Sequence, residues 1–346
     1  MSTPPRPATL RDVAQRAGVH VTTASRALDP AKSSKVNAVT ARRVRAAARA
    51  LDYQPNEIAR GLRTNRSMSV AVLVPDLTNP LFPPIVRGAE KVLSAVGYMT
   101  LVVNTDDDAE RQAALLQSLR GRKVDGFIVA TAHRDDAQLD EARAQGVPIV
   151  LVNRRTDTPG FASIVGDDHS GIKLAVRHLL ELGHRRIGHI AGPTGTTTGH
   201  ARLRAFQQAL ADAGADNGSV ALATTFTEAD GAQAMRRLLA EHPEVTAVVA
   251  ANDLIALGCL DALAEAGLRC PQDISLVGFN DMPLADRLTP ALTTIHVPHH
   301  AIGGEAARVL LELLGDPQLP PKSVTLPVTL VVRDSTAPPS DRRIDS

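Results

Sequence analysis

Polar residues at two kinds of position in this 346-residue chain could bind a partner. Near the start, Thr22 and Arg26 are four residues apart in a run with apolar residues at helical spacing, so both would lie on the outward face of one helix. Farther on, polar side chains follow directly after apolar, strand-like runs. In parallel sheets, ligands bind beyond the carboxyl ends of the strands. The chain therefore carries two candidate binding regions of different character.

The candidate pocket draws its residues from several strand ends. These residues are Asn79, Phe82, Asn153, Arg154, Asn252, Asp253 and Asn280. The stretch 192–202 adds a loop between a strand and a helix, and its small residues allow a ligand to approach closely. This loop lacks the Gly-Lys-Ser/Thr of a P-loop, and no Gly-x-Gly-x-x-Gly follows any strand. A small molecule other than a nucleotide cofactor is therefore favoured.

Residue types that carry catalysis or hold metals are present without the spacing that either needs. There is no Gly-x-Ser-x-Gly elbow, and Cys259 and Cys270 stand in no activating or metal-binding context. His178, His184 and His189 surround the end of one predicted helix, which favours a structural role over a zinc site. The sequence predicts no enzyme, metal or cofactor.

Three short helices are predicted to position the first candidate region. The stretch Thr9-Leu-Arg-Asp12 is a capping box that starts the first helix, and Gly18 ends it. A second helix is predicted over 21–28, and a third over about 37–51 with an asparagine as its cap. Two short helices joined by a tight glycine turn are typical of a helix-turn-helix.

Charge separates this head from the rest of the chain. Residues 1–66 contain 13 Lys and Arg against 4 Asp and Glu, whereas the remaining residues contain 25 against 33. The head therefore carries +9 and the body −8. A basic helix-turn-helix on a slightly acidic body makes double-stranded DNA the leading partner of the head.

The body alternates strand-like runs with helical stretches from residue 69 onward, which predicts parallel sheets. A first series of runs ends near residue 165, and a second occupies about 186–279, so two Rossmann-like lobes are expected. We expect 292–297 to cross back to the first lobe, the helix 302–314 to belong to it, and 324–332 to return to the second.

Length and composition exclude other classes. The chain suffices for about two to three domains, and no apolar run approaches the roughly 18–20 residues of a membrane-spanning helix, so no membrane partner is expected. No apolar segment precedes the first predicted helix, and two cysteines make no disulfide framework. A cytoplasmic location is therefore expected.

The stretch from Thr9 to Leu28, with 53–63 after it, closely resembles the head of the LacI/GalR family of transcriptional regulators, and the similarity continues through most of the chain. The resemblance implies that the second helix enters the major groove. Its implied base contacts are Val21, Thr22 and Arg26, and its implied phosphate contacts are Thr23, Ser25, Asn37 and Thr40. His20 stands where this family usually has a capping Ser or Thr, and apolar Val21 favours contact with a thymine methyl group.

The resemblance also implies a hinge helix that docks in the minor groove. The segment is short and contains Gly61, so it should be marginal as an isolated helix. Its implied contacts are Asn56, Ala59, Leu62 and Arg63. Leu62 would wedge between the central base pairs and kink the DNA.

For the body, the resemblance implies a periplasmic-binding-protein-like fold that holds a small effector between its lobes. The implied contacts are Phe82, Arg154, Thr196, Thr198, Arg202, Phe226, Asp253 and Asn280. Asn153 and Asn280 replace acids common in the family, and Thr196 replaces an arginine found in one branch. These departures favour a neutral, sugar-like effector over a strongly charged one.

The expected organisation is a head, a hinge and a two-lobed body. The ranges are 1–54 for the head, 55–68 for the hinge and linker, and 69–335 for the body, with lobe 1 at about 69–166 and 298–320 and lobe 2 at about 167–292 and 322–333. Residues 336–346 carry no leucine heptad and are predicted to be a disordered tail, so a homodimer is expected. A two-fold dimer would bind a pseudo-palindromic operator.

The sequence thus predicts a DNA-binding transcriptional regulator, most simply a repressor, whose operator affinity is controlled by a small polar effector. A solute-binding protein without DNA function, cytoplasmic or exported, is the alternative, because it would share the two-lobed body. An exported solute-binding protein would need a signal segment. A basic head would serve no purpose in either kind, so the head argues against this alternative. An enzyme is a third alternative, although no catalytic constellation is assembled in the sequence.

Overall fold

The computed structural model describes residues 8–29, 33–53, 66–215 and 218–340. The chain divides into two compact units, Met1–Ser67 and Met68–Ser346. Each unit has buried apolar clusters of its own. The hinge residues implied by the resemblance, Asn56, Ala59, Leu62 and Arg63, lie outside the described part of the chain.

The head contains the three helices expected from the sequence. They are α1 at Leu10–Arg16, α2 at Val21–Leu28 and α3 at Ala38–Ala50, with a short 3-10 helix, η1, at Ser33–Lys35. Val13, Ala24 and Val44, one from each α-helix, are buried in a common core. Burial of this apolar stripe, rather than helix propensity, stabilises helices as short as these.

Local side-chain contacts set the helix ends in the head. The Asp12 amide donates to the Thr9 hydroxyl at 3.4 Å, and the Thr9 amide donates to the Asp12 carboxylate at 2.8 Å, which confirms the capping box. Gly18 has a φ of 60°, so it supplies the left-handed residue predicted after α1. The Asn37 side chain accepts from the Val39 amide at 2.8 Å and caps α3.

Lobe 1 of the body is built on a sheet of six parallel strands. They are β1 (Ser69–Val74), β2 (Met99–Asn104), β3 (Gly126–Val129), β4 (Ile149–Val152), β5 (Ala162–Gly166) and β11 (Ser323–Leu326). Their order across the sheet is β11-β5-β4-β3-β1-β2. β1, β3 and β4 are buried along almost their whole length, as expected of strands covered on both faces.

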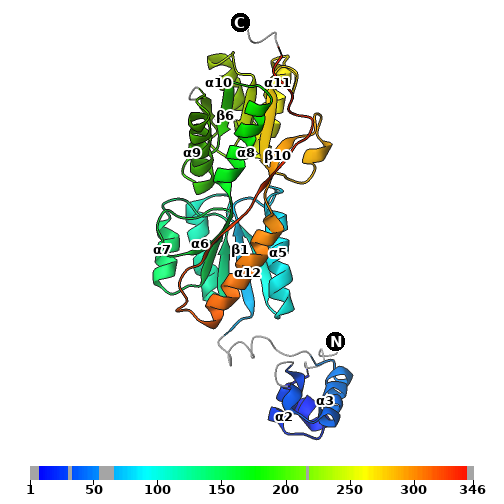
Figure 1. The fold of residues 1–346 in the computed structure, drawn as a ribbon. Coiled ribbons are helices and arrows are strands. Elements are labelled where there is room, and N and C mark those ends of the chain that lie inside the picture. The colour runs from blue at the N-terminus through cyan, green and yellow to red at the C-terminus, as the bar shows by residue number, and fades with distance from the viewer. Residues whose placement is uncertain (1–7, 30–32, 54–65, 216–217, 341–346) are drawn as a thin grey trace, which may run out of the picture. The chain divides into compact units, whose positions relative to one another are not determined.

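Lobe 2 has a second six-stranded sheet. Its strands are β6 (Ile187–Ala191), β7 (Ser219–Leu222), β8 (Ala247–Ala250), β9 (Ser275–Asn280), β10 (Thr293–His296) and β12 (Thr329–Val331). The order is β12-β10-β9-β8-β6-β7, and only β12 is antiparallel to its neighbour. The two lobes are drawn one above the other in Figure 1. Two Rossmann-like lobes, the predicted architecture, are confirmed.

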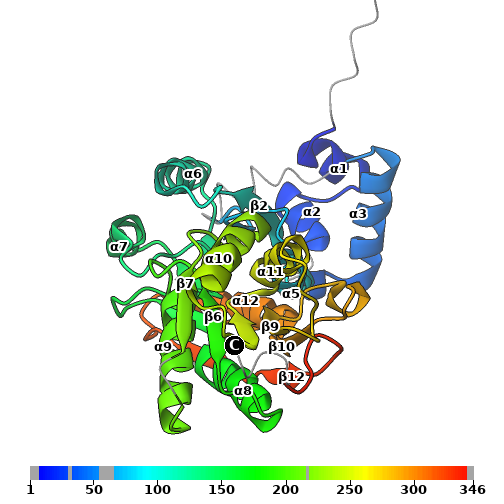
Figure 2. The ribbon, with the colours of Figure 1, turned by 90° about the horizontal axis from the view of Figure 1, so that it is seen from above.

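Helices cover both faces of each sheet. In lobe 1 these are α5 (Phe82–Ala95), α6 (Ala109–Gly121), α7 (Ala137–Ala144) and α12 (His299–Gly315). In lobe 2 they are α8 (Asp168–Glu181), α9 (Thr197–Asp212), α10 (Glu228–Glu241) and α11 (Asp253–Glu265), with a 3-10 helix, η2, at Ala285–Arg287. Figure 2 shows α10 and α11 on one face of the second sheet and α8 and α9 on the other. Each lobe is thus a three-layer α/β structure.

Two glycines allow α12, which returns from lobe 2, to pack closely on α5. A Cβ atom at Gly88 would lie 2.0 Å from the His300 carbonyl oxygen, and one at Gly303 would lie 1.8 Å from the Ile85 carbonyl oxygen. Any larger residue would force the helix backbones apart. This contact fixes α12 to lobe 1 directly after the chain has crossed from lobe 2.

The late segments of the chain differ from the prediction in two places. Residues 293–296, expected to cross between lobes, form β10 in the lobe 2 sheet, and the crossing follows them. The run 324–332 is two strands, because β11 pairs with β5 in lobe 1 and only β12 belongs to lobe 2. Pro327 separates them and has no N–H to continue a ladder. The lobe 2 range 322–333 was therefore too long at its start.

The predicted disordered tail is wrong for its first residues. The Thr336 hydroxyl lies 3.0 Å from His178 Nε2, and the Ala337 amide donates to the Ser275 hydroxyl at 3.0 Å. Small polar side chains and backbone groups thus hold the segment around residues 336–337 on lobe 2, although its composition suggested disorder. Residues 341–346 lie outside the described part. Within the described part of the chain, no helix is long and apolar enough to span a membrane.

Candidate functional site

The outward face of α2 carries the residues expected to contact DNA. Thr22 and Arg26 are exposed, and Val21, Thr23 and Ser25 are partly exposed. Ala24 and Ala27 are buried on the opposite side of the helix. The fold therefore presents the residues of the predicted reading face together, without using them in the head core.

α3 also presents polar and basic residues at the surface of the head. Asn37, besides capping the helix, is exposed, and Thr40 is partly exposed. The side chains at Arg42, Arg43, Arg45 and Arg49 are also exposed. Cationic side chains displayed around small capping residues are suited to phosphate oxygens.

His20 stands where the family usually has a capping Ser or Thr, and it caps α2 as they would. Its Nδ1 accepts from the Thr22 amide at 3.3 Å and lies 2.9 Å from the Thr22 hydroxyl. An imidazole that accepts at Nδ1 carries its proton on Nε2. His20 therefore both starts the helix and orients Thr22 on the reading face.

Replacing His20 with alanine is expected to destabilise the head by about 1 kcal/mol, because the amide of Thr22 loses its acceptor. His20→Ser restores a capping oxygen and should recover most of this loss. Thermal unfolding of the full chain, followed through the head by a fluorescent label on the exposed face of α3, measures the difference. Equal stability of the alanine and serine variants would show that the cap contributes nothing.

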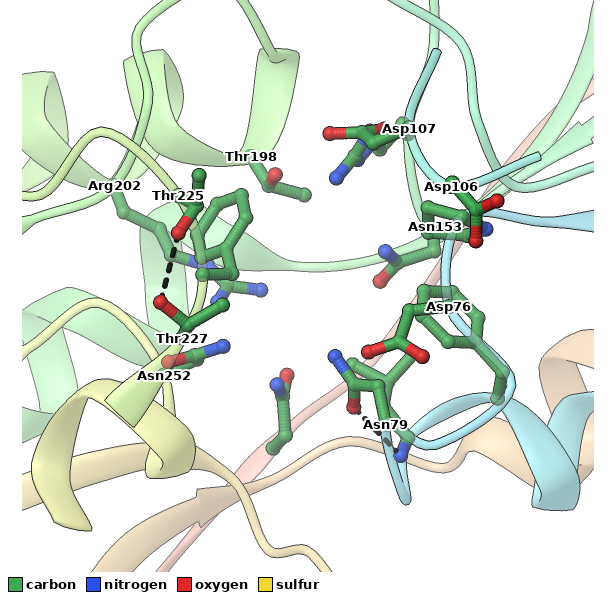
Figure 3. Close-up of a pocket in the computed structure, with 16 residues that line it drawn as sticks. Asp76, Asn79, Asp106, Asp107, Asn153, Thr198, Arg202, Thr225, Thr227 and Asn252 are labelled. Atoms are coloured by element: carbon green, nitrogen blue, oxygen red, sulfur yellow. Dashed lines mark hydrogen bonds and ion pairs between the residues drawn. The ribbon is translucent and has the colours of Figure 1, made fainter. Parts of the chain in front are cut away.

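A cavity of about 300 Å³ lies between the two lobes of the body. Its wall comprises Pro75, Asp76, Asn79, Leu81, Phe82, Asp106, Asp107, Asn153, Arg154, Thr198, Arg202, Thr225, Phe226, Thr227, Asn252 and Asn280. Figure 3 shows side chains from the two lobes facing each other across it. These residues end a strand, follow its carboxyl end, or lie in the first two turns of the next helix. The cavity is therefore where parallel sheets are expected to bind ligands.

Nine residues predicted from the sequence line this cavity. They are Asn79, Phe82, Asn153, Arg154, Thr198, Arg202, Phe226, Asn252 and Asn280. The other two predicted residues, Thr196 and Asp253, do not line the cavity. Thr196 caps α9, accepting from the Gly199 amide at 3.2 Å and donating to the Pro193 carbonyl at 2.8 Å. Its contact with the Thr198 hydroxyl at 3.2 Å makes it a support for a lining residue.

Arg154 is held on the lobe 1 side of the cavity. It is only 4% exposed and donates through Nη1 to Asp107 at 2.8 Å. Its guanidinium carbon lies 5.8 Å from the centre of the Phe226 ring, which belongs to lobe 2. Its Nε is buried without a hydrogen-bond partner among the described residues. A buried donor of this kind is suited to a ligand acceptor.

Arg202 is fixed on the lobe 2 side. Its Nε donates to Asp168 at 2.8 Å, its Nη1 donates to the Ala251 carbonyl at 2.6 Å, and its guanidinium lies 3.7 Å from the centre of the Phe279 ring. Burial raises the pKa of Asp168, and the charge of Arg202 opposes that rise. Burial and the charge of Arg202 together lower the pKa of His299 to about 3, so this nearby imidazole stays neutral.

Asn280 ends β9 with a φ of 113°, a left-handed conformation that is rare for asparagine in a strand. Its Oδ1 is buried without a hydrogen-bond partner among the described residues. Asp253 holds the following turn, because its carboxylate accepts from the Met282 amide at 2.7 Å and from the Thr294 hydroxyl at 2.6 Å. Burial raises the pKa of Asp253 to about 7. Asp253 thus positions Asn280 rather than touching the cavity.

Five polar lining residues were missed by the sequence reasoning. They are Asp76, Asp106, Asp107, Thr225 and Thr227. All follow β1, β2 or β7 by a few residues, so the rule that found Asn79 and Asn153 could have included them. Asp106 and Asp107 have φ values of 56° and 53° and form a tight turn, which the sequence alone does not single out.

Comparison with known proteins bears on both units. Residues 9–56 match the model of the bacterial regulatory proteins of the lacI family, and residues 176–336 match a periplasmic binding protein-like domain. The ribose operon repressor of Halalkalibacterium halodurans is 32% identical over 328 residues, which cover 95% of this chain and 97% of that protein. The chain belongs to the lacI family of bacterial regulatory proteins. The resemblance stated from the sequence is confirmed.

Solved structures of lacI-family proteins share the fold of this chain. The Lac repressor dimer bound to operator and the anti-inducer ONPF superimposes with a TM-score of 0.84 at 29% identity, covering 96% of this chain and 100% of that one. A lacI-family regulator from Enterococcus faecium with bound ribose gives a TM-score of 0.70 at 33% identity, covering 79% and 100%. The helical head and the two-lobed α/β body of this chain therefore match the fold of the Lac repressor.

Proposed function

We propose that this lacI-family member is a homodimeric transcriptional repressor whose head binds a pseudo-palindromic double-stranded operator in the cytoplasm. The exposed Arg26 of α2 and the exposed arginines of α3, on a head that carries +9, are the observation that supports it. The similar Lac repressor dimer was solved on its operator, and the similar curated protein is named a repressor rather than an enzyme. A two-fold protein on a two-fold site is the arrangement that this family likeness favours.

The proposed DNA contacts fall on the described head and on the hinge. Val21, Thr22 and Arg26 would read bases in the major groove, and Thr23, Ser25, Asn37 and Thr40 would contact phosphates. Asn56, Ala59, Leu62 and Arg63 would act in the minor groove. We expect base contacts to set sequence preference and phosphate contacts to set register.

The cavity between the lobes would hold a small polar effector, sugar-like in chemistry, which changes the affinity of the head for the operator. The regulator from Enterococcus faecium was solved with bound ribose. A ligand that favours one arrangement of the lobes can change operator affinity about 5–150-fold. The nine predicted lining residues would contact the effector, with Thr196 and Asp253 supporting them.

The test is a gel shift of the full chain on genomic fragments, at several salt concentrations and with or without sugars. Binding should weaken by about 10³-fold or more between 50 and 200 mM salt, because phosphate contacts release counterions. A fragment retained without loss at high salt would contradict this mechanism. Failure to retain any fragment, with tight sugar binding, would favour the solute-binding alternative.

Arg26→Ala should cost about 1–3 kcal/mol of binding free energy per half-site and relax the base preference at one position. Arg16, the exposed last residue of α1, gives a matched control. Arg16→Ala should change affinity slightly and leave the preferred sequence as it was. Selection from a randomised DNA library with each variant measures both quantities. An unchanged preference in the Arg26 variant would remove this residue from the reading face.

A further inference from the structure

The turn that follows β9 has a backbone conformation that few residues adopt. Asn280, the last residue of β9, has a φ of 113°, and Asp281 after it has a φ of 54°. Positive φ values are uncommon for residues with a side chain, so two in succession persist only where neighbouring groups hold them. Asn280 lines the cavity, whereas Asp281 does not. The groups that hold Asp281 therefore affect how Asn280 faces a ligand.

Asp281 is held by Arg333, a residue of the segment that leaves β12. Arg333 Nη2 donates to Asp281 Oδ1 at 2.7 Å, and the two side chains are only 19% and 18% exposed. His296 Nδ1 lies 2.9 Å from the other carboxylate oxygen, but the His296 side chain is 49% exposed. Solvent and salt screen a partly buried ion pair less than an exposed one. Arg333 is thus the main partner of this carboxylate.

Arg333 is itself fixed on the chain that enters β10. Its amide donates to the Thr293 hydroxyl at 2.9 Å, and its Nη1 donates to the Leu292 carbonyl at 2.7 Å. β12 pairs with β10 immediately before this point, with Val331 opposite Thr294. One end of the planar guanidinium therefore bonds the start of β10 and the other bonds the turn after β9. Such a group fixes the direction of its partner as well as balancing its charge.

Asp253 supports the same turn from another side. Its carboxylate accepts from the Met282 amide at 2.7 Å and so fixes the backbone after the turn. Arg333 fixes a side chain within the turn. Neither residue lines the cavity. Asn280 Oδ1, which is buried without a hydrogen-bond partner among the described residues, is thus directed by two groups that lie outside the wall.

We propose that Arg333 is a positioning residue of the effector cavity, which holds Asp281 and thereby directs Asn280 Oδ1 toward the ligand. Arg333 does not contact the ligand itself. The segment that follows the last strand of the chain is thus part of the machinery that binds the effector. This inference rests on the proposed function of the cavity and adds to it a residue from outside the wall.

The first test is hydrogen–deuterium exchange of the full chain without ligand, measured by mass spectrometry on peptides that cover residues 279–283. Arg333→Met should raise the exchange rate of these amides by at least about fivefold, because the Asp281 side chain loses its partner and the turn opens more often. Arg333→Lys keeps a cation for Asp281 and should restore part of the protection. An exchange rate that is the same in Arg333→Met and the natural chain would overturn the proposal.

Ser335→Ala is the matched control in the same segment. The Ser335 hydroxyl donates to the Leu276 carbonyl at 2.6 Å and accepts from the Thr293 amide at 2.8 Å, and neither bond involves Asp281. This variant should lower the stability of lobe 2 and leave the exchange of residues 279–283 unchanged. If it accelerated exchange there as much as Arg333→Met, Arg333 would have only a structural role and the proposal would be wrong.

Calorimetric titration with ribose, glucose, fructose and xylose tests the consequence for binding. A sugar that binds the natural chain should bind Arg333→Met about tenfold more weakly, because one acceptor in the cavity is no longer directed at it, and should bind Ser335→Ala normally. Equal affinity for Arg333→Met and the natural chain would also overturn the proposal. If none of the four sugars bound the natural chain, the sugar-like effector of the proposed function would be contradicted, and exchange in the turn would decide the role of Arg333.

Discussion

Arg202→Met is expected to destabilise the body by about 3–5 kcal/mol, because it leaves the carboxylate of Asp168 buried without its cation. The side chain of Asp168 is only 16% exposed, and burial already raises its pKa. The variant also loses the contact with the Phe279 ring at 3.7 Å. Arg202 was predicted from the sequence to contact the effector, and the structure adds that it holds the lobe 2 wall together.

A second substitution should restore part of the stability that Arg202→Met loses. In the double variant Arg202→Met with Asp168→Asn, no buried charge remains unpaired, so at least half of the lost stability should return. Arg204→Met, on the exposed side of the same helix, is the matched control and should change stability by less than about 0.5 kcal/mol. Urea unfolding followed by circular dichroism gives all four values. If Arg202→Met alone were as stable as Arg204→Met, the ion pair would make no net contribution to the stability of the body.

The same pair affects how any loss of effector response in this variant is interpreted. Destabilisation by several kcal/mol lowers the fraction of folded protein. The weaker response of such a sample could be mistaken for weaker effector binding. The response should therefore be measured on the double variant, which keeps the fold and still lacks the guanidinium. We expect operator binding without effector control in that protein.

The head could be predicted closely because its signals are local. The capping box at Thr9 and Asp12 and the glycine at position 18 act within three or four residues, so the sequence contains the whole interaction. His20 was noted from the sequence as a departure from the usual capping Ser or Thr of the family, and the structure shows that its imidazole caps α2. The residue at the N-terminal cap of α2 differs from the usual one, but the helix still requires a hydrogen-bond acceptor there.

The pocket could be predicted in outline, because strand ends converge in any parallel sheet. Asn252 and Asp253 show why the outline does not settle each residue. Both follow β8, yet Asn252 lines the cavity while Asp253 points back under the turn after β9. Which of two adjacent residues faces the ligand depends on the direction in which α11 leaves the strand. That direction is set by packing between elements that are distant in sequence.

The division of the last strands depended on distant contacts in the same way. The apolar residues of β11 and β12 form one continuous pattern apart from Pro327. Their assignment to different sheets follows from pairing with β5 and β10, which lie more than thirty residues earlier in the chain. Lobe boundaries drawn from periodicity alone could therefore err by one strand.

Asp253→Asn is expected to remove a pH dependence of several kcal/mol from the stability of the body. The folded protein holds the proton of Asp253 up to a pH of about 7, whereas the unfolded chain releases it near the ordinary value of 3.8. The folded state thus binds more protons between these values, so the free energy of unfolding falls as the pH rises through this window. Above about pH 7 the buried carboxylate is charged and the loss is complete.

The difference between the natural chain and the variant isolates this group from all others. From pH 5 to pH 8 the natural chain should lose about 3 kcal/mol relative to Asp253→Asn, at about 1.4 kcal/mol per pH unit up to the folded pKa. Asp261→Asn, on the exposed side of α11, should show no such trend. Urea titrations at intervals of half a pH unit measure the curve. If the difference in the free energy of unfolding did not change with pH, the Met282 amide and the Thr294 hydroxyl would stabilise the carboxylate as well as water does. The turn that presents Asn280 would then not depend on pH.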